Sequence, residues 1–140
     1  MQIDVYINTT AQGPAWQEAE GYFVIKLCGW SGTMRHESAR LFRTRTTARI
    51  LSCELLVNAF YILNKYANDW RISDEDTVHI HADSNIIHLF SQKQFNKWCQ
   101  SGWKDSKGRD LPSQYRRLYE VITESNRSFD FSVKGEEEDV

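Results

Sequence analysis

The feature that most constrains the fold is a change of hydrophobic period at Thr46. Before it, three segments carry apolar or β-branched residues in a strand-like pattern, at 2–8, 21–28 and 33–46. After it, residues 46–67 contain no Gly or Pro and are rich in Leu, Ala, Ile and Tyr, which predicts a long, largely buried helix. The short connections between the three strands favour an antiparallel meander.

The rest of the chain switches between strand-like and helix-like segments. Residues 77–82 alternate as a fourth strand, 85–100 predict one or two short helices, 111–125 predict a helix, and 127–134 alternate as a last strand. The order β-β-β-α-β-α-α-β predicts a single α/β domain over residues 1–140. We expect a five-stranded mixed sheet, three antiparallel strands followed by βαβ units, with helices on both faces.

Composition excludes several classes of protein. The chain has 140 residues, of which 41% are hydrophobic, with 7 Gly and 2 Pro, so fibrous and disordered classes are not expected. The apolar runs are far too short to span a membrane, and we expect no membrane partner. Three widely spaced cysteines suit a reducing compartment and show no metal-finger spacing, which favours a cytoplasmic location.

The net charge of −2 hides an uneven distribution of basic residues. Five arginines fall between residues 35 and 49, and seven lysines and arginines fall between 93 and 117, beside Trp98 and Trp103. Four of the 19 acidic residues lie in the tail at 136–139. Basic and aromatic side chains together suit phosphate contact and base stacking. The alternative is a solvated helix face whose tryptophans pack inward.

Two carboxylates occupy unusual positions. Glu54 lies inside the apolar helix, and Asp83 follows the fourth strand, as Asn8 ends the first strand. Ligands of open α/β sheets tend to bind beyond the carboxyl ends of strands, so neighbouring first and fourth strands would let the three residues converge. Such a cluster suits Mg²⁺, which prefers oxygen ligands. The alternative is one surface carboxylate and one buried ion pair.

The fourth strand also carries His79 and His81, which share a face with Asp83. A His-x-His pair on a strand can bind zinc, but the sequence shows no third His or Cys ligand. Histidines that satisfy local hydrogen bonds are the commoner interpretation.

Several segments together resemble the type 1 ribonuclease H family, in order and at fitting separations over nearly the whole chain. The residues that carry the resemblance are Ile3–Asn8, Gly13-Pro14, Gly21–Ile25, Cys53-Glu54-Leu55-Leu56, His81-Ala82-Asp83-Ser84, Lys97-Trp98, Gly102-Trp103-Lys104 and Phe131-Ser132-Val133-Lys134-Gly135. Ile3–Asn8 looks like the family's first strand, Gly13-Pro14 and Gly21–Ile25 look like its Gly-rich loop and second strand, and Cys53-Glu54-Leu55-Leu56 looks like its Met-Glu-Leu helix motif. His81-Ala82-Asp83-Ser84 looks like its Thr-Asp-Ser strand end, the two Trp segments look like its Trp-rich basic protrusion, and the final segment looks like its last strand.

The resemblance implies a two-metal site, holding Mg²⁺ or Mn²⁺, that cuts the RNA strand of an RNA–DNA hybrid. By position, Glu54 and Asp83 would be metal ligands, and Asn8 stands where the family has its first catalytic Asp. The residues expected to contact nucleic acid are Arg43, Arg45, Arg49, Lys97, Trp98, Trp103 and Lys104.

The sequence also departs from the family pattern. Asn8 carries no charge; it is either natural or an engineered Asp→Asn change. The hybrid-gripping run before the helix Glu is replaced by Arg49-Ile50-Leu51-Ser52, Glu136 replaces a His, and the terminal helix with the final Asp is expected to be missing. Two hypotheses follow: a weak metal-dependent ribonuclease H, or a non-catalytic module that binds nucleic acid or a protein partner.

Overall fold

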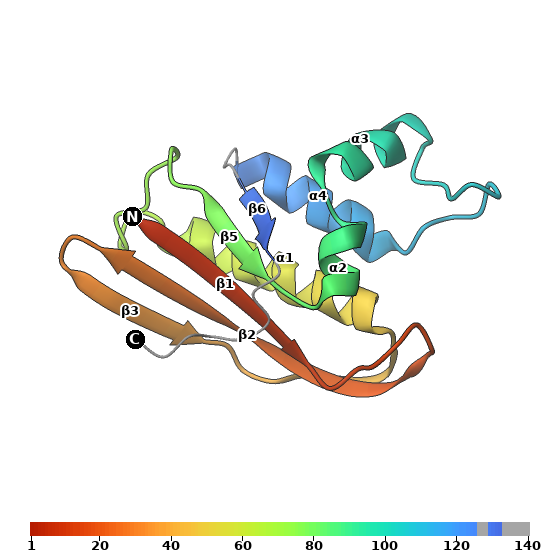
Figure 1. Ribbon diagram of the computed structural model, residues 1–140, viewed down its shortest axis with the longest axis horizontal. Coiled ribbons are helices and arrows are strands. Elements are labelled where there is room, and N and C mark those ends of the chain that lie inside the picture. Colours follow the sequence, from red (N-terminus) through yellow and green to blue (C-terminus); the bar gives the residue numbers. More distant parts are fainter. Residues whose placement is uncertain (126–128, 133–140) are drawn as a thin grey trace.

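The computed structural model describes residues 1–125 and 129–132 (Figure 1). Its element order matches the predicted order, except that the third strand is divided in two and residues 85–100 contribute two short helices, one of the two alternatives expected there. The elements are β1 (Gln2–Thr9), β2 (Gln17–Gly29), β3 (Gly32–Glu37), β4 (Leu41–Thr46), α1 (Ala48–Tyr66), β5 (Val78–His81), α2 (Ser84–Leu89), α3 (Gln92–Gln100), α4 (Ser113–Ser125) and β6 (Phe129–Ser132).

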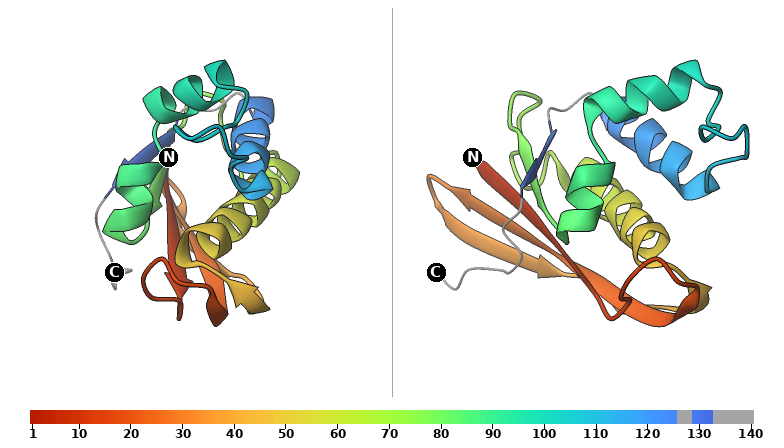
Figure 2. Two further views of the ribbon diagram at one scale, coloured as in Figure 1. Left: turned by 90° about the vertical axis from the view of Figure 1, so that its right-hand side faces the viewer. Right: turned by 45° about the vertical axis from the view of Figure 1, so that its right-hand side comes forward.

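The sheet is mixed, as predicted. Strand order is β3-β2-β1-β5-β6, and β4 also pairs with β2. The meander pairs are antiparallel, whereas β5 runs parallel to both β1 and β6. In the left view of Figure 2, α2 lies on the opposite side of β1 from α1 and α4, so helices flank both sides of the sheet.

The predicted third strand, 33–46, is divided into β3 and β4, which pair with successive parts of the long β2. Glu37 lies opposite Val24 and Leu41 lies opposite Gly21, so three residues at 38–40 face only two on β2. The extra residue interrupts the ladder between β3 and β4 without moving the strand to another sheet position, and a second irregularity of register lies between Gln17 and Ala19 in the β2–β4 pair. The five predicted strand positions are therefore present.

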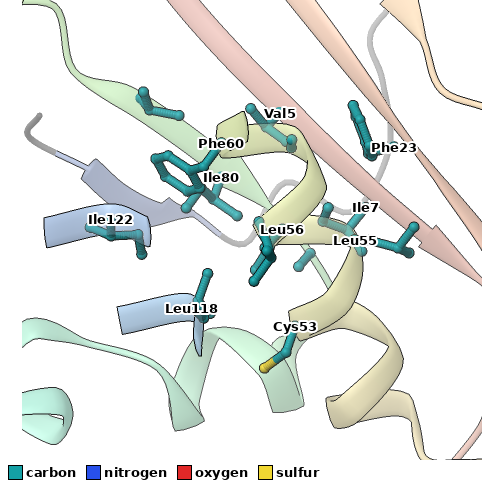
Figure 3. Close-up of a cluster of buried hydrophobic side chains, with 14 of the residues drawn as sticks. Val5, Ile7, Phe23, Cys53, Leu55, Leu56, Phe60, Ile80, Leu118 and Ile122 are labelled. Atoms are coloured by element: carbon teal, nitrogen blue, oxygen red, sulfur yellow. The ribbon is translucent and has the colours of Figure 1, made fainter. Parts of the chain in front are cut away.

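The core lies between the sheet and the pair α1 and α4. Its largest contributors point from both layers toward one another in Figure 3, among them Val5, Phe23, Leu56, Phe60, Ile80 and Leu118. Each fully buried apolar side chain of this kind stabilises the fold by about 1.5–3 kcal/mol. The core therefore fixes the position of α1 against β1 and β2.

Two local features set where α1 begins and how closely it approaches the sheet. Thr47 is its N-cap, and the Thr47 side chain accepts the Ile50 backbone N–H at 3.2 Å. Gly21 lies under the helix, because a Cβ there would come within 2.9 Å of the Leu55 side chain and 2.6 Å of the Asn8 carbonyl oxygen. The first turns of α1 are thus held close to the carboxyl end of β1.

The predicted last strand, 127–134, is present as β6 over its central residues. The acidic tail at 136–139 and the expectation of a missing terminal helix lie outside the described residues. Within residues 1–125 and 129–132, no helix has the length and apolar character needed to cross a membrane.

Candidate functional site

A cavity of about 480 Å³ opens at the carboxyl ends of β1 and β5, and we call it the sheet-end cavity. Tyr6 of β1 lies opposite His81 of β5 in the parallel pair, so Asn8 and Asp83 leave neighbouring strands at the same level. The residues that line the cavity include Asn8, Thr9, Gln12, Ala48, Ser52 and Asp83. The first and fourth predicted strands are neighbours, which was the condition for convergence, and Asn8 and Asp83 both line the cavity at their ends.

Helix α1 contributes Ala48 and Ser52 to the sheet-end cavity, and Glu54 is not among its lining residues. Successive helical residues are rotated by about 100°, so Ser52 and Glu54 project about 200° apart. Ser52 is 2% exposed and belongs to the side of α1 that faces β1. Consequently, the helix offers a hydroxyl to the sheet-end cavity where a carboxylate was expected.

Glu54 is instead held by Arg43 of β4. The Arg43 guanidinium donates to Glu54 Oε2 from Nη2 at 2.9 Å and from Nε at 3.2 Å. The two residues line a second cavity of about 420 Å³, the β4-side cavity, together with Trp16, Arg45, Asp110 and Gln114. Glu54 is only 20% exposed, so this bidentate pair is well placed to satisfy a carboxylate in an otherwise apolar helix.

The prediction that Glu54 converges with Asn8 and Asp83 is therefore corrected by the phase of α1. Sequence reasoning also missed Ser52. The signal that could have found it is the N-cap Thr47, which makes Ala48 the first helical residue and places Ser52, four residues later, on the same face of the helix. In the described part of the chain, no group of three or more His, Cys, Asp or Glu side chains is arranged to hold a metal ion.

The histidines of β5 have local partners, as the commoner interpretation expects. His81 is buried, its Nε2 lies 2.7 Å from Asp4 Oδ1, and its ring stacks on Tyr6 with centroids 4.5 Å apart. Within the described residues, its Nδ1 has no hydrogen-bond partner. Asp4, whose side chain is 13% exposed, and buried His81 thus form a pair on the central strands.

The predicted contacts at the start of α1 fall into two groups. Arg43 is engaged by Glu54, whereas Arg45 and Arg49 are exposed and make no ion pair with any described residue. The Arg45 guanidinium carbon lies 5.0 Å from the centre of the Trp16 ring, which is itself 55% exposed. Trp16 was not singled out from the sequence, because nothing local pairs it with an arginine 29 residues away.

The tryptophans of the predicted basic protrusion pack inward. Trp98 is 7% exposed and stacks on Tyr115, so it is not available to stack on a base. Trp103 is half-buried, with ring centroids 6.2 Å from Trp98 and 5.4 Å from Tyr119. Lys97 and Lys104 are exposed beside them, although Lys104 pairs with Asp110. The protrusion therefore offers basic charge without exposed tryptophan rings.

Comparison with known structures decides the fold. No protein-family model matches the sequence, and neither does any curated protein. Among solved structures, LC9-RNase H1, described as a type 1 RNase H with the type 2 active-site motif, superposes with a TM-score of 0.66 at 14% identity, over 95% of this chain and 63% of that one. RNase H1 of Halobacterium salinarum gives a TM-score of 0.59 at 15% identity, over 95% and 85%.

The protein has a ribonuclease H-like fold. The chain also superposes on one part of a larger viral protein. A foamy viral protease-reverse transcriptase, solved with an RNA/DNA hybrid, superposes with a TM-score of 0.66 at 12% identity, over 94% of this chain but 17% of that one. The chain thus spans 63% of LC9-RNase H1 and 17% of the viral protein. At such identities, the likeness establishes the ribonuclease H-like fold alone.

Burial and hydrogen bonding shift the pKa values of several groups in this ribonuclease H-like fold. Burial raises the pKa of the Cys53 thiol well above its usual range, and the neighbouring Glu54 charge adds to the effect. Burial also raises the pKa of Tyr115 to about 12. In the basic loop, the Arg109 backbone N–H lowers the pKa of Asp105. None of these groups lines the sheet-end cavity.

Proposed function

We propose that the protein is a nucleic-acid-binding module that does not cut its ligand by two-metal chemistry. The observation that carries the proposal is the position of Glu54, which Arg43 holds on the β4 side of α1 while Ser52 faces the sheet-end cavity. The fold supports binding, and the side chains at the strand ends argue against cleavage.

The donors of the sheet-end cavity do not fit a pair of Mg²⁺ ions. The side chains that line it provide one carboxylate, from Asp83, together with the amides of Asn8 and Gln12 and the hydroxyls of Thr9 and Ser52. Two divalent ions held about 4 Å apart require several anionic oxygen ligands to offset their charge. A carboxylate from the tail at 136–139, an alternative raised by the sequence, lies outside the described residues.

The proposed binding surface is the start of α1 and the end of β4. Arg45 and Arg49 flank the N-cap Thr47, and the first turn of α1 contains no acidic residue. Unpaired N–H groups at a helix N-terminus attract anions, so a phosphate there would meet two guanidinium groups and the positive end of the helix. Trp16 beside Arg45 adds an exposed aromatic ring suited to a nucleobase or sugar.

Two structural neighbours support nucleic acid as the ligand class. The foamy viral protease-reverse transcriptase is described in complex with an RNA/DNA hybrid, and in another structure in complex with double-stranded DNA. We therefore take the RNA–DNA hybrid as the first probe. Exposed Lys97 and Lys104 would extend the basic surface to the protrusion.

The test is hybrid binding over a salt series, with cleavage measured in parallel. We expect binding of a labelled hybrid whose affinity falls steeply with salt, because each phosphate contact contributes about 0.9 to the slope of log K against log salt. No cleavage is expected with Mg²⁺ or Mn²⁺. Cleavage that disappears in Asp83→Asn would instead establish a weak metal-dependent nuclease. Absence of binding at low salt would leave a protein partner as the ligand.

A further inference from the structure

The β4-side cavity lies where the residues before β2, the junction of β4 with α1, and the residues before α4 meet. Its apolar lining comes from Ile50, in the first turn of α1, and from Leu111 and Pro112, just before α4. The volume of about 420 Å³ falls within the range of about 300–1,000 Å³ that is typical of small-molecule sites. Such a lining suits a flat, largely apolar group with polar edges.

Trp16 lines this cavity from a loop that hydrogen bonds hold in place. The Gln17 side chain closes the loop, because its Nε2 donates to the carbonyls of Gln12 at 2.8 Å and of Ala15 at 2.9 Å. Its Oε1 accepts the Gln12 backbone N–H at 3.0 Å. Trp16 lies within this closed loop and is 55% exposed, so its ring is held outside the core and is available to stack on a ligand.

The polar groups around Trp16 suit the parts of a nucleotide. The Arg45 guanidinium carbon lies 5.0 Å from the centre of the Trp16 ring, so a phosphate bound by Arg45 would lie near a base stacked on Trp16. Gln114, in the first turn of α4, also lines the cavity. Its amide has both donor and acceptor groups, which can pair with the edge of any base.

The two carboxylates that line the cavity are each paired with a basic side chain. Glu54 is held by Arg43, and Asp110 is paired with Lys104. These pairs offset the negative charge that would otherwise oppose a phosphate close to the cavity. The electrostatics of the β4-side cavity are therefore compatible with a nucleotide.

We propose that the β4-side cavity binds an unpaired nucleobase, stacked on Trp16, while Arg45 and Arg49 bind the adjoining phosphates. This inference rests on the proposed nucleic-acid binding and specifies the form of the ligand. A base within a duplex is stacked between its neighbours, so it reaches a side chain in a cavity only by leaving the helix, at an energetic cost. The preferred ligand is therefore a hybrid with a single-stranded end. Because every base has an aromatic face, the preference does not depend on base identity.

The experiment compares RNA–DNA hybrids that share one duplex and differ at their ends. One is blunt, one has a short single-stranded overhang, and one has the same overhang without its bases; the overhang is placed in turn at 3′ and 5′ ends. Fluorescence anisotropy measures each affinity. In at least one position, the overhang with bases should bind about fivefold tighter or more than the abasic overhang. Both overhangs carry the same phosphates, so this ratio should not change with salt.

Variants at two exposed tryptophans test whether the base stacks on Trp16. Trp16→Ala should reduce the ratio to about one, whereas Trp16→Phe should keep most of it because an aromatic ring remains. Trp30→Ala is the matched control, since Trp30 is fully exposed at the tip of the β2–β3 hairpin and lies outside the lining of the cavity. Its ratio should equal that of the unmodified chain.

Two results would overturn the inference: equal binding of the base-bearing and abasic overhangs at every position, or a ratio that Trp16→Ala leaves unchanged. If the blunt hybrid still binds with a steep salt dependence in that case, the proposed nucleic-acid binding stands without the base site. If no hybrid binds at low salt, both the proposed function and this inference fail.

Discussion

The two sides of the first turns of α1 have different chemistry although they belong to one helix. The side facing β1 joins Ser52 to Asn8 and Asp83 in a cavity with one lining carboxylate. The side facing β4 joins Glu54 to Arg43, with Arg45 and Trp16 nearby. The contrast shows how much two positions along a helix matter. A carboxylate at position 52 would face the sheet-end cavity, whereas the carboxylate at position 54 binds Arg43 on the other side. The two sides should therefore respond separately to mutation.

The largest expected effect is on hybrid binding at the β4 side. Arg45→Ala/Arg49→Ala should weaken hybrid binding by about a hundredfold, because each lost charge-assisted phosphate contact costs about 1.5 kcal/mol. The salt slope should also become shallower by about 1.8, or 0.9 for each contact. Fluorescence anisotropy measures both.

The controls for this effect lie on the other side of α1 and on α4. Asp83→Asn in the sheet-end cavity and Arg116→Ala on α4 should each retain binding within about threefold, since neither removes a proposed phosphate contact. Equal losses in Arg116→Ala and in the double variant would show that binding follows net charge and not this surface.

The next effect is on stability, at Gly21 of β2, which lies under α1 beside Asn8 and Leu55. Gly21→Ala should lower the free energy of unfolding by about 1–3 kcal/mol, because the new Cβ would collide with the Asn8 carbonyl oxygen and the Leu55 side chain. Urea denaturation measures the change. Gly13→Ala, where nothing lies within 4 Å of the added Cβ but φ is +69°, separates backbone strain from crowding. A milder effect at Gly21 than at Gly13 would contradict the close approach of α1.

A smaller effect is expected from the ion pair of the β4 side. Glu54→Gln should raise hybrid affinity by about threefold, because Arg43 is released for phosphate contact. The free energy of unfolding should change by less than about 1 kcal/mol, since Arg43 is 43% exposed. Arg43→Met provides the reciprocal control, with no gain in affinity. Reduced binding in Glu54→Gln would show that the carboxylate itself serves the ligand.

The smallest effect is on the free energy of unfolding at alkaline pH. It comes from Tyr115 on α4, which lies outside the two sides of α1 compared above. Because the pKa of Tyr115 is raised to about 12 from an ordinary value near 10, its stabilising contribution is complete below pH about 10 and is lost as pH rises toward about 12. Tyr115→Phe should flatten this decline in the free energy of unfolding. Tyr61→Phe, which removes an exposed phenol, is the control. If the free energy of unfolding declines equally in Tyr115→Phe, the alkaline loss of stability comes from another group.

Sequence patterns were sufficient for the fold because each element carries its own signal. The alternation in β1 and β2 and the Gly-free run of α1 specify strands and helix, and the order of elements along the chain favours a mixed sheet. From sequence, the pairing of β1 with β5 was only a condition, and it depends on long-range contacts. The interruption at 38–40 was not predictable, since it depends on how β2 pairs on both sides of it.

The site was harder to predict because it depends on helix phase. A motif match aligned Glu54 with a helix carboxylate, yet the rotation of α1 depends on which of its side chains are buried in the core, among them Leu51, Leu55 and Leu56. That packing directs Ser52 toward Asn8. Likewise, the basic residues around Trp98 in the sequence suggest an exposed ring. Its burial depends on stacking against Tyr115 of α4, a contact that local sequence does not reveal.

The central claim is that α1 presents Ser52, and not Glu54, to the sheet-end cavity. Titration of Mn²⁺ into Asn8→Asp/Ser52→Glu, followed by electron paramagnetic resonance, tests it most directly. The account predicts binding at least about tenfold tighter than to Asn8→Asp alone. The reason is that position 52 adds a third carboxylate to the cavity, beside Asp83 and the new carboxylate at position 8.

Adding Glu54→Gln to that double variant should leave Mn²⁺ binding unchanged, because Glu54 lies on the β4 side of α1. The contrary result has two parts. If Asn8→Asp alone binds Mn²⁺ as tightly as the double variant, and Glu54→Gln abolishes that binding, then Glu54 reaches the sheet-end cavity and the account is contradicted.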